Sequence, residues 1–183
     1  MNEIWIDKKI SDIIPIPVLK LLKPFNFNSI YDLGNKKTNN KPYSIYYKEK
    51  NIEYNSIDIN GKDGALKLDL TKPINLQSRE MVSNIGTSEH VTNQEAVFKN
   101  IHNLSNFRIV HWVPVKDKRK DHGYYGYTKK FFKLLAELNY YEIEKLYYYN
   151  PRNIICCSYR KTKDLQFKWD EELLKYIGVN KCQ

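Results

Sequence analysis

Short apolar runs alternate with longer amphipathic segments along most of the chain. Seven runs have the length and the β-branched or aromatic content of strands; they are residues 28–34, 52–60, 64–74, 79–86, 107–115, 140–149 and 153–161. Other segments carry apolar residues at helical spacing; they are residues 16–26, 92–104, 127–140 and 169–179, with a shorter helical turn at 42–50. This alternation predicts an α/β fold built on a mostly parallel sheet.

Boundary residues define several of these elements. Pro24 closes the first helix and Pro73 stops the third strand, because proline lacks the backbone N–H that both structures use. Thr128 is a good N-cap for the clearest amphipathic helix, and Gly178 ends the last helix. An Asn-Pro turn at 150–151 joins the last two strands, so these strands are predicted to be antiparallel to each other.

The chain has 183 residues, which fits one domain with a full core, and we expect a single domain over residues 1–183. No apolar run reaches the roughly 18 residues of a membrane-spanning helix, and no segment has the layout of a signal peptide. A soluble, cytoplasmic protein without a membrane partner is therefore expected. Cys156, Cys157 and Cys182 form no CxxC or His/Cys cluster, so they are predicted to be reduced thiols, and no metal site is expected.

The formal net charge of +9 raises nucleic acid as a partner. The excess is mostly lysine, in a sequence rich in Lys, Asn, Ile and Tyr, whose codons are rich in A and T. Compositional bias of the gene is therefore the simpler explanation. The basic residues are also scattered, and the densest group, residues 116–120, fits a solvated loop as well as a phosphate-binding patch. Nucleic acid is kept as an alternative partner that these features do not favour.

Acidic residues stand at the ends of the first three predicted strands. They are Asp32, Asp58 and Asp69, and Gly34 follows the first of them. In open α/β sheets, ligands bind beyond the carboxyl ends of the strands, where the strand order reverses. Each aspartate alone would be a turn former or a helix cap. Three at corresponding positions favour a ligand site, because the ribose of a nucleoside needs acceptors for its hydroxyls and a carboxylate offers two oxygens.

Two longer segments follow these acids in a characteristic order. The sequence "SNIGTSEHV" (83–91) leads into a helix and a strand ending in Pro114, and "DHGYYGYTKK" (121–130) is a His-containing loop that leads into the next helix. Together, residues 28–161 resemble the class I S-adenosylmethionine-dependent methyltransferases, especially the small-molecule group with a Leu-Glu-His-Val type motif. The resemblance implies a Rossmann-like sandwich with a seven-stranded, mostly parallel sheet and an antiparallel last strand. It also implies methyl transfer, with S-adenosylmethionine as the cofactor.

The resemblance places a set of residues at the strand ends against the cofactor: Asp32, Gly34, Asn35, Asp58, Asp69, Leu70, Asn84 and Gly86. Asp58 would accept hydrogen bonds from the ribose hydroxyls. Asp69 and the backbone of Leu70 would lie at the adenine edge. Asp32 with Gly34 would approach the methionine end, where a missing side chain lets the backbone come close.

The glycine-rich turn of the family is only partly present. The family pattern after the first strand is Asp/Glu-x-Gly-x-Gly-x-Gly, and Gly34 is the one glycine of that pattern that remains. Asn35 tolerates a left-handed backbone better than other non-glycine residues. Lys36 and Lys37 have no such tolerance and add bulk. Three outcomes stay open: weak cofactor binding, a remodelled loop, or lost binding.

Two histidines are the candidate catalytic bases. Histidine titrates near neutral pH, and both His90 and His122 fall in loops at the predicted binding edge. Glu89 would contact the substrate or orient a histidine. Capping of the helix that begins near residue 93 explains Glu89 and His90 as well as function does. Tyr124 and Tyr125 would line the acceptor pocket.

Missing motifs narrow the choice of methyl acceptor. After the fourth strand there is no Asn/Asp-Pro-Pro-aromatic segment and no Pro-Cys nucleophile, and Asn84 stands where cap ribose methyltransferases would need an aspartate. We therefore expect a small-molecule or glycan-like hydroxyl or amine acceptor, and a monomer or homodimer. His102, in a helix, and His111, in a strand, are predicted to be structural. The alternatives are a methyltransferase-fold binding or regulatory protein that has lost catalysis, and an RNA-binding or RNA-modifying protein.

Overall fold

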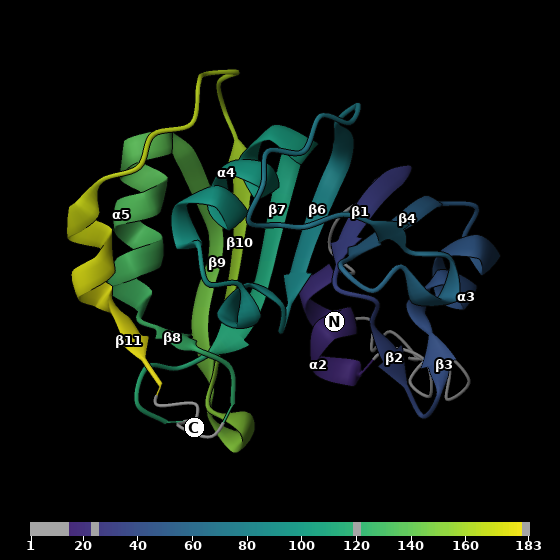
Figure 1. Ribbon diagram of the computed structural model, residues 1–183, viewed down its shortest axis with the longest axis horizontal. Helices are drawn as coiled ribbons and strands as arrows, with labels where there is room; N and C mark the ends of the chain where they lie inside the picture. Colours follow the sequence, from purple (N-terminus) through teal and green to yellow (C-terminus); the bar gives the residue numbers. More distant parts are fainter. Residues whose placement is uncertain (1–14, 23–25, 119–121, 181–183) are drawn as a thin grey trace, which may run out of the picture.

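A seven-stranded sheet forms the centre of the computed structural model, which describes residues 15–22, 26–118 and 122–180 (Figure 1). The strands from β5 across to β7 run parallel to their neighbours, and β10 is antiparallel to both β7 and β9. The predicted sheet, mostly parallel with an antiparallel last strand, is therefore confirmed. In spatial order the strands are β5 (Leu66–Lys67), β4 (Glu53–Asp58), β1 (Ser29–Leu33), β6 (Arg79–Ile85), β7 (Ser105–Pro114), β10 (Ile154–Lys161) and β9 (Tyr141–Tyr149).

The strand order reverses between β1 and β6. From β1 the chain moves outward to β4 and β5, and it then crosses back to form β6 on the other side of β1. Ligands of open α/β sheets bind beyond the carboxyl ends of the strands at such a reversal. In Figure 1 this edge is at the bottom, where the arrow of β6 ends.

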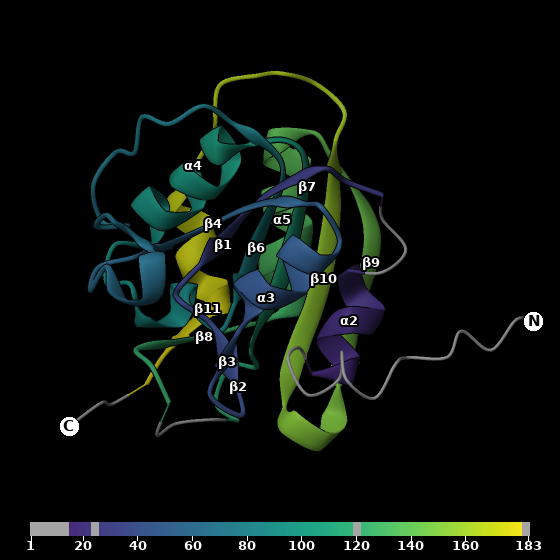
Figure 2. The same cartoon turned by 90° about the vertical axis from the view of Figure 1, so that its right-hand side faces the viewer.

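Helices cover both faces of the sheet (Figure 2). α4 and α5 lie on one face with the first large apolar cluster, and α2 and α3 lie on the other face with the second. None of the helices in the described part of the chain is long and apolar enough to cross a membrane. The bounds of the helices are α2 (Ile16–Leu22), α3 (Tyr43–Glu49), α4 (Gln94–Leu104) and α5 (Lys129–Asn139).

Strand β7 is buried on both sides. Successive side chains of a strand point to opposite faces. Ile109 and Val113 join the cluster under α4 and α5, whereas Val110 and Trp112 join the cluster under α2 and α3. Burial of each such side chain stabilises the fold by roughly 1.5–3 kcal/mol. From Ile109 to Pro114 every position of the strand is buried, and every residue except His111 is apolar, as expected from the sequence for a central strand.

Side-chain caps begin the two long helices. The hydroxyl of Thr128 accepts a hydrogen bond from the amide of Phe131 at 3.2 Å, which confirms Thr128 as the N-cap of α5. The side chain of Asn93 accepts from the amide of Ala96 at 3.0 Å and caps α4. Because Asn93 is this cap, the helix-capping interpretation of Glu89 and His90 is wrong.

The end of the chain differs from the prediction. Residues 169–179 were expected to form an α-helix, but a 3₁₀ helix at Glu171–Tyr176 is followed by strand β11 (Ile177–Val179). Leu173 is buried whereas Leu174 is 44% exposed, so the segment lacks a full apolar stripe. β11 pairs with strand β8 (Tyr125–Tyr127), a segment predicted to form the end of a loop and the first residue of the following helix.

Other predicted boundaries also shifted. The third strand is only β5, and the chain after it turns at Asp69 rather than continuing to residue 74. Lys37–Thr38 (β2) and Lys41–Pro42 (β3) pair as a small ribbon just after β1. Three predictions fall at least partly on residues outside those that the structure describes: the helix stop at Pro24, the basic group at 116–120 and the thiol of Cys182.

The two histidines predicted to be structural are buried, and so are two of the cysteines predicted to be reduced thiols. His102 bonds to the hydroxyl of Tyr141 at 2.6 Å, and burial lowers its pKa to about 4. His111 is fully buried in β7, and burial lowers its pKa to about 3. Cys156 and Cys157 are buried in β10 as free thiols, and burial raises the pKa of Cys156 to about 11.

Candidate active site

The turn after β1 is held tightly against the end of β6. Gly34 has φ +75°, a left-handed conformation that favours glycine. The hydroxyl of Thr87 donates to the carbonyl of Leu33 at 2.5 Å, and a Cβ at position 34 would lie 2.5 Å from that hydroxyl oxygen. The remaining glycine of the family pattern is therefore required both by the backbone and by close packing.

Asp58 ties the loops after β1 and β4 together. One carboxylate oxygen accepts from the amide of Asn35 at 3.0 Å, and the other accepts from the amide of Asn60 at 2.9 Å. The side-chain amide of Asn35 donates to the carbonyl of Lys62 at 2.8 Å and to Asp63 at 2.9 Å. Each oxygen of Asp58 keeps further lone pairs. The residue is only half-buried, so it can accept from a ligand as well.

Lys36 stands where the family pattern has its second glycine, and its side chain crosses the point of strand reversal. Its ammonium group donates to the carbonyl of Gly86 at 2.6 Å, so it connects the end of β1 to the end of β6. The same nitrogen would lie 3.0 Å from a Cβ at Gly34. Lys37 instead points to an ion pair with Asp63. The lysine that replaces the glycine therefore places a positive charge inside the expected ligand site.

Asp32 lies inside the sheet. It is fully buried, and it accepts hydrogen bonds from the hydroxyls of Ser83 at 2.6 Å and Tyr54 at 3.3 Å. Burial raises the pKa of this carboxyl to about 7, although the Ser83 hydrogen bond and the charge of Lys36 oppose that shift. The hydrogen bonds of Asp32 thus go to neighbouring strands.

Three other predicted cofactor residues make their polar contacts within the protein. Asp69 accepts from the amide and hydroxyl of Thr71 at 2.8 and 2.7 Å, which lowers its pKa. Leu70 is buried, and its carbonyl accepts from the side chain of Asn100 at 3.0 Å. Asn84 is also buried, and it bonds to Ser88 and His111.

Glu89, His90 and His122 form a cluster beside Gly86. Glu89 is only 1% exposed, and one of its carboxylate oxygens lies 3.4 Å from Nε2 of His122 and 4.0 Å from Nε2 of His90. The two imidazole rings are 4.9 Å apart, nearly perpendicular. Burial lowers the pKa of His90, with a further contribution from His122, while Glu89 opposes the shift. The structure therefore brings together the two predicted bases and Glu89.

A glycine the sequence analysis did not consider places His122 in the cluster. Gly123 has φ +68°, and a Cβ there would lie 2.8 Å from the Glu89 side chain and 2.9 Å from its carbonyl oxygen. The next amide, of Tyr124, donates to the carbonyl of Glu89 at 2.7 Å. The side chain of Asn180 donates to the carbonyl of His122 at 3.0 Å. The loop therefore lies directly on Glu89 because residue 123 has no side chain.

An open cavity of about 1060 Å³ adjoins this cluster. Of the predicted site residues, Gly86, Glu89 and His122 line it, together with Lys36. Tyr124 and Tyr125 are not among its lining residues, and the hydroxyl of Tyr125 donates to the carbonyl of Thr92 at 2.9 Å. The sequence analysis did not foresee the remaining wall, formed by α2, β7 and the β9–β10 hairpin, which supplies Val18, Lys20, Trp112, Tyr147, Tyr149 and Arg152.

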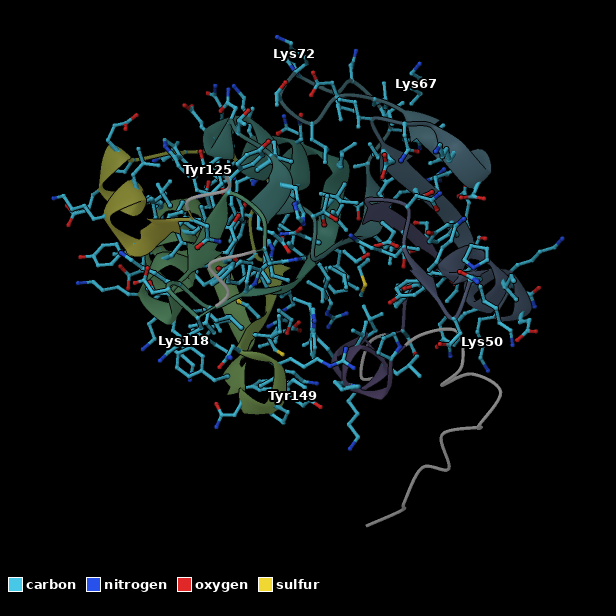
Figure 3. The ribbon with its side chains drawn as sticks, turned by 60° about the horizontal axis from the view of Figure 1, so that its bottom comes forward. Lys50, Lys67, Lys72, Lys118, Tyr125 and Tyr149 are labelled. Carbon is cyan, nitrogen blue, oxygen red and sulfur yellow. The ribbon has the colours of Figure 1, made fainter. Side chains whose placement is uncertain are left out.

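Figure 3 turns the carboxyl edge of the sheet toward the viewer. Tyr149, at the end of β9, lies near α2, in agreement with their shared cavity. The labelled lysines Lys50, Lys67, Lys72 and Lys118 lie at separate places around the molecule. These four lysines therefore do not form one patch.

Solved structures of methyltransferases share this fold. The 1,6-didemethyltoxoflavin N1-methyltransferase of Burkholderia thailandensis, crystallised with 1,6-didemethyltoxoflavin and S-adenosylhomocysteine, has a TM-score of 0.61 and 11% identity, covering 80% of this chain and 76% of that one. The N-methyltransferase NodS of Bradyrhizobium japonicum WM9, in complex with S-adenosylhomocysteine, has a TM-score of 0.58 and 10% identity, covering 80% and 85%. The magnesium protoporphyrin IX methyltransferase of Synechocystis PCC 6803, with bound S-adenosylmethionine, has a TM-score of 0.54 and 13% identity, covering 80% and 76%.

No protein-family model matches the sequence, and no curated protein matches it either. The likeness is therefore one of fold. The chain has the fold of the class I S-adenosylmethionine-dependent methyltransferases, as the sequence resemblance implied.

Proposed function

We propose that the chain is an S-adenosylmethionine-dependent methyltransferase that methylates a hydroxyl or amine group of a small acceptor. The observation that carries this proposal is the position of Glu89 and His122. They lie beside Gly86 at the carboxyl end of β6, and they line a cavity that also reaches Lys36 of the first loop. The candidate base His122 and the predicted cofactor residue Gly86 thus border one space. The ligands crystallised with the three methyltransferases compared above agree with this assignment.

The residues at the ends of β1 and β4 fit the polar groups of this cofactor. Asp58 keeps acceptor capacity for ribose hydroxyls after binding two backbone amides. The ammonium of Lys36 has two N–H donors beyond the one that Gly86 accepts, which suits the carboxylate of the methionine end. Since Thr87 and Lys36 fill the space beside Gly34, the Lys36 side chain has to turn aside as the ligand enters.

When bound, the cofactor supplies a methyl group on a positively charged sulfur. The chain then has to orient the acceptor for in-line attack and to accept its proton. His122 is suited to the second task, because its side chain is 40% exposed and lines the cavity. Glu89, at 3.4 Å, holds the imidazole in place and stabilises its protonated form, in the manner of a carboxylate behind a catalytic histidine.

The cavity lining favours a flat acceptor that carries negative charge. Aromatic rings of Trp112, Tyr147 and Tyr149 supply faces for stacking, and Lys20 and Arg152 supply exposed cations. A planar hydroxyl-bearing or amine-bearing molecule with a carboxylate or phosphate group satisfies both features.

Calorimetric titration of the purified chain with S-adenosylhomocysteine tests the proposal. We expect binding by the wild type, much weaker binding by Asp58→Ala, and unchanged binding by Glu172→Ala, an exposed acid on the 3₁₀ helix near the chain end. Thermal melting of each variant separates lost binding from lost folding. A folded wild type that neither binds S-adenosylhomocysteine nor gains thermal stability from it would refute the proposal.

Lys36 also favours a second function, that of a binding protein with the methyltransferase fold but without turnover. Its side chain occupies the space in which the family pattern has glycine. In that case Lys36→Gly, which restores the second glycine of the pattern, would still not bind S-adenosylhomocysteine. Asp58→Ala would then leave the biological activity of the protein intact.

A further inference from the structure

The carboxyl group of Glu89 is buried without a complete set of partners. One oxygen, Oε2, has no hydrogen-bond partner among the described residues, although the side chain is 1% exposed. Among the described residues, the polar partners of the other oxygen are two histidine nitrogens, at 3.4 and 4.0 Å. A buried carboxyl without partners costs several kcal/mol. A bound ion or ligand can supply the missing partner of such a group.

Lys36, which lines the same cavity, does not complete it. The ammonium of Lys36 is hydrogen-bonded to the carbonyl of Gly86, and no ion pair joins it to Glu89 among the described residues. The tight contact with Gly123 fixes the Glu89 side chain and the loop that carries His122. Close backbone packing thus positions two of the three potential ligands, Glu89 and His122.

We propose that Glu89, His90 and His122 bind a divalent metal ion. One ligand atom from each side chain can be chosen so that all three lie within 4.8 Å of one another, a closeness that no other trio of His, Cys, Asp and Glu side chains reaches in the described part of the chain. Bonds of about 2.0–2.2 Å to a tetrahedral ion place its ligands roughly 3.4 Å apart. The Glu89–His122 pair already has this spacing, and a small rotation of the half-exposed His90 brings in the third ligand.

The ligand types select the class of ion. Two imidazoles and one carboxylate suit Zn²⁺ and related transition ions, whereas Mg²⁺ and Ca²⁺ prefer oxygen ligands alone. Three protein ligands leave at least one coordination position open, as in catalytic rather than structural zinc sites. Since His122 and Glu89 line the cavity, that open position faces the acceptor.

The role of the ion rests on the proposed function, but its binding does not. An acceptor hydroxyl bound at the open position would release its proton to solvent, because a metal ion lowers the pKa of a bound hydroxyl. A lone pair of that oxygen then forms the new O–CH₃ bond, and the electron pair of the breaking S–CH₃ bond stays on sulfur. The metal keeps its charge throughout. Metal activation would thus replace proton acceptance by His122 and would make a hydroxyl, rather than an amine, the acceptor.

Titration of the chelator-treated, full-length chain with Zn²⁺ tests the site. We expect one site per chain, weakened about 100-fold or more in His122→Ala and His90→Ala, and unchanged in Glu95→Gln, an exposed acid on α4. Co²⁺ in place of Zn²⁺ should give the visible spectrum of a tetrahedral nitrogen and oxygen site, without a sulfur-to-metal band. Zn²⁺ should raise the melting temperature of the wild type and not that of His122→Ala.

Equal Zn²⁺ affinity in the wild type and both histidine variants would overturn the site, as would a cobalt spectrum dominated by sulfur. Melting of the metal-free variants shows whether each one folds. Zn²⁺ binding without S-adenosylhomocysteine binding would keep the metal site and refute the methyltransferase. Full methyl transfer by the chelated protein would refute the catalytic role of the ion.

Discussion

The two sides of the strand reversal differ in whether their polar groups have partners within the protein. On the side of β1 and β4, the carboxylate of Asp58 accepts two backbone amides, and Lys36 donates to the carbonyl of Gly86. On the side that follows β6, Glu89 is buried with an oxygen that has no hydrogen-bond partner among the described residues. The first side is complete within the protein, whereas the second is completed only by something that binds. A ligand that binds on the first side therefore has to displace an existing contact. A ligand that binds on the second side supplies the missing partner of Glu89.

This difference predicts which substitutions change stability and which change activity. Satisfied polar groups contribute to folding, whereas an unsatisfied buried carboxyl costs folding free energy. Substitutions on the completed side should therefore change stability or, where the group binds the cofactor, its affinity. Substitutions at Glu89 should change activity first, and four predictions test this division.

The largest effect is expected from Glu89→Gln. The amide keeps the shape of the side chain but can neither stabilise a protonated His122 nor bind a metal ion strongly, so methyl transfer should fall by about 1,000-fold in kcat/KM. The metal-free variant should be more stable than the wild type by about 1 kcal/mol, because a buried neutral amide costs less than a buried carboxylate. Kinetics and denaturant unfolding measure the two quantities, with Glu95→Gln as the control. A loss of stability that parallels the loss of activity would contradict the division.

The second prediction concerns pH and Asp32. Its pKa in the folded protein is raised to about 7 from 3.8, so the folded state binds more protons than the unfolded state between these values. The contribution of Asp32 to stability is therefore fully present below pH 3.8 and is lost as pH rises through 7. A shift of about three pKa units corresponds to about 4 kcal/mol. Asp32→Asn, which still accepts from Ser83, should match the wild type near pH 4 and exceed it in stability by up to that amount at pH 8.

Denaturant unfolding of both proteins between pH 4 and pH 8 checks this prediction. The other titrating groups cancel in the difference between the two stability curves. Asp164→Asn, at an exposed position, should show no comparable change. A difference that stays constant with pH would mean that Asp32 does not titrate in this range.

Periodicity and strand-end chemistry predicted much of this architecture. The doubly buried strand β7, the helix α5 with its cap and the antiparallel hairpin at the end of the sheet all follow from local pattern. Asp58 was predicted from its place at the end of the second strand, and the structure puts its carboxylate at the end of β4 against the loop after β1. Each of these features depends on a short stretch of sequence, so a local pattern is enough to predict it.

Features built from distant segments escaped prediction. β8 and β11 pair because Gly126 and Gly178 lie opposite each other and against Lys116, a contact between segments about 50 residues apart. The cavity wall from α2 and the β9–β10 hairpin likewise depends on tertiary packing. Gly123 offered a local signal, a glycine directly after a candidate catalytic histidine, but its close approach to Glu89 becomes evident only in three dimensions.

Gly34→Ala tests how tightly the completed side is packed. The left-handed backbone costs an alanine about 1 kcal/mol, and the clash of its Cβ with the Thr87 hydroxyl raises the expected loss of stability to about 3 kcal/mol. Gly64→Ala is the matched control. Gly64 has φ +82°, but a Cβ there meets no atom within 4 Å. That variant should therefore lose only the stability that the left-handed backbone costs an alanine. Equal losses of stability in the two variants, measured by denaturant unfolding, would show that the Thr87 side chain moves aside without destabilising the fold.

The smallest effect, and the one that decides how the lysine of the first loop acts, is expected from Lys36→Met. Methionine keeps most of the length of the side chain and removes its charge. If Lys36 pairs with the carboxylate of the methionine end, S-adenosylhomocysteine should bind about 10-fold more weakly, or about 1.4 kcal/mol, which is within the range of a partly exposed charge-assisted hydrogen bond. Lys41→Met, an exposed lysine on β3, should leave the affinity unchanged. Tighter binding by Lys36→Met would mean that the ammonium group blocks the cofactor site instead of binding the cofactor.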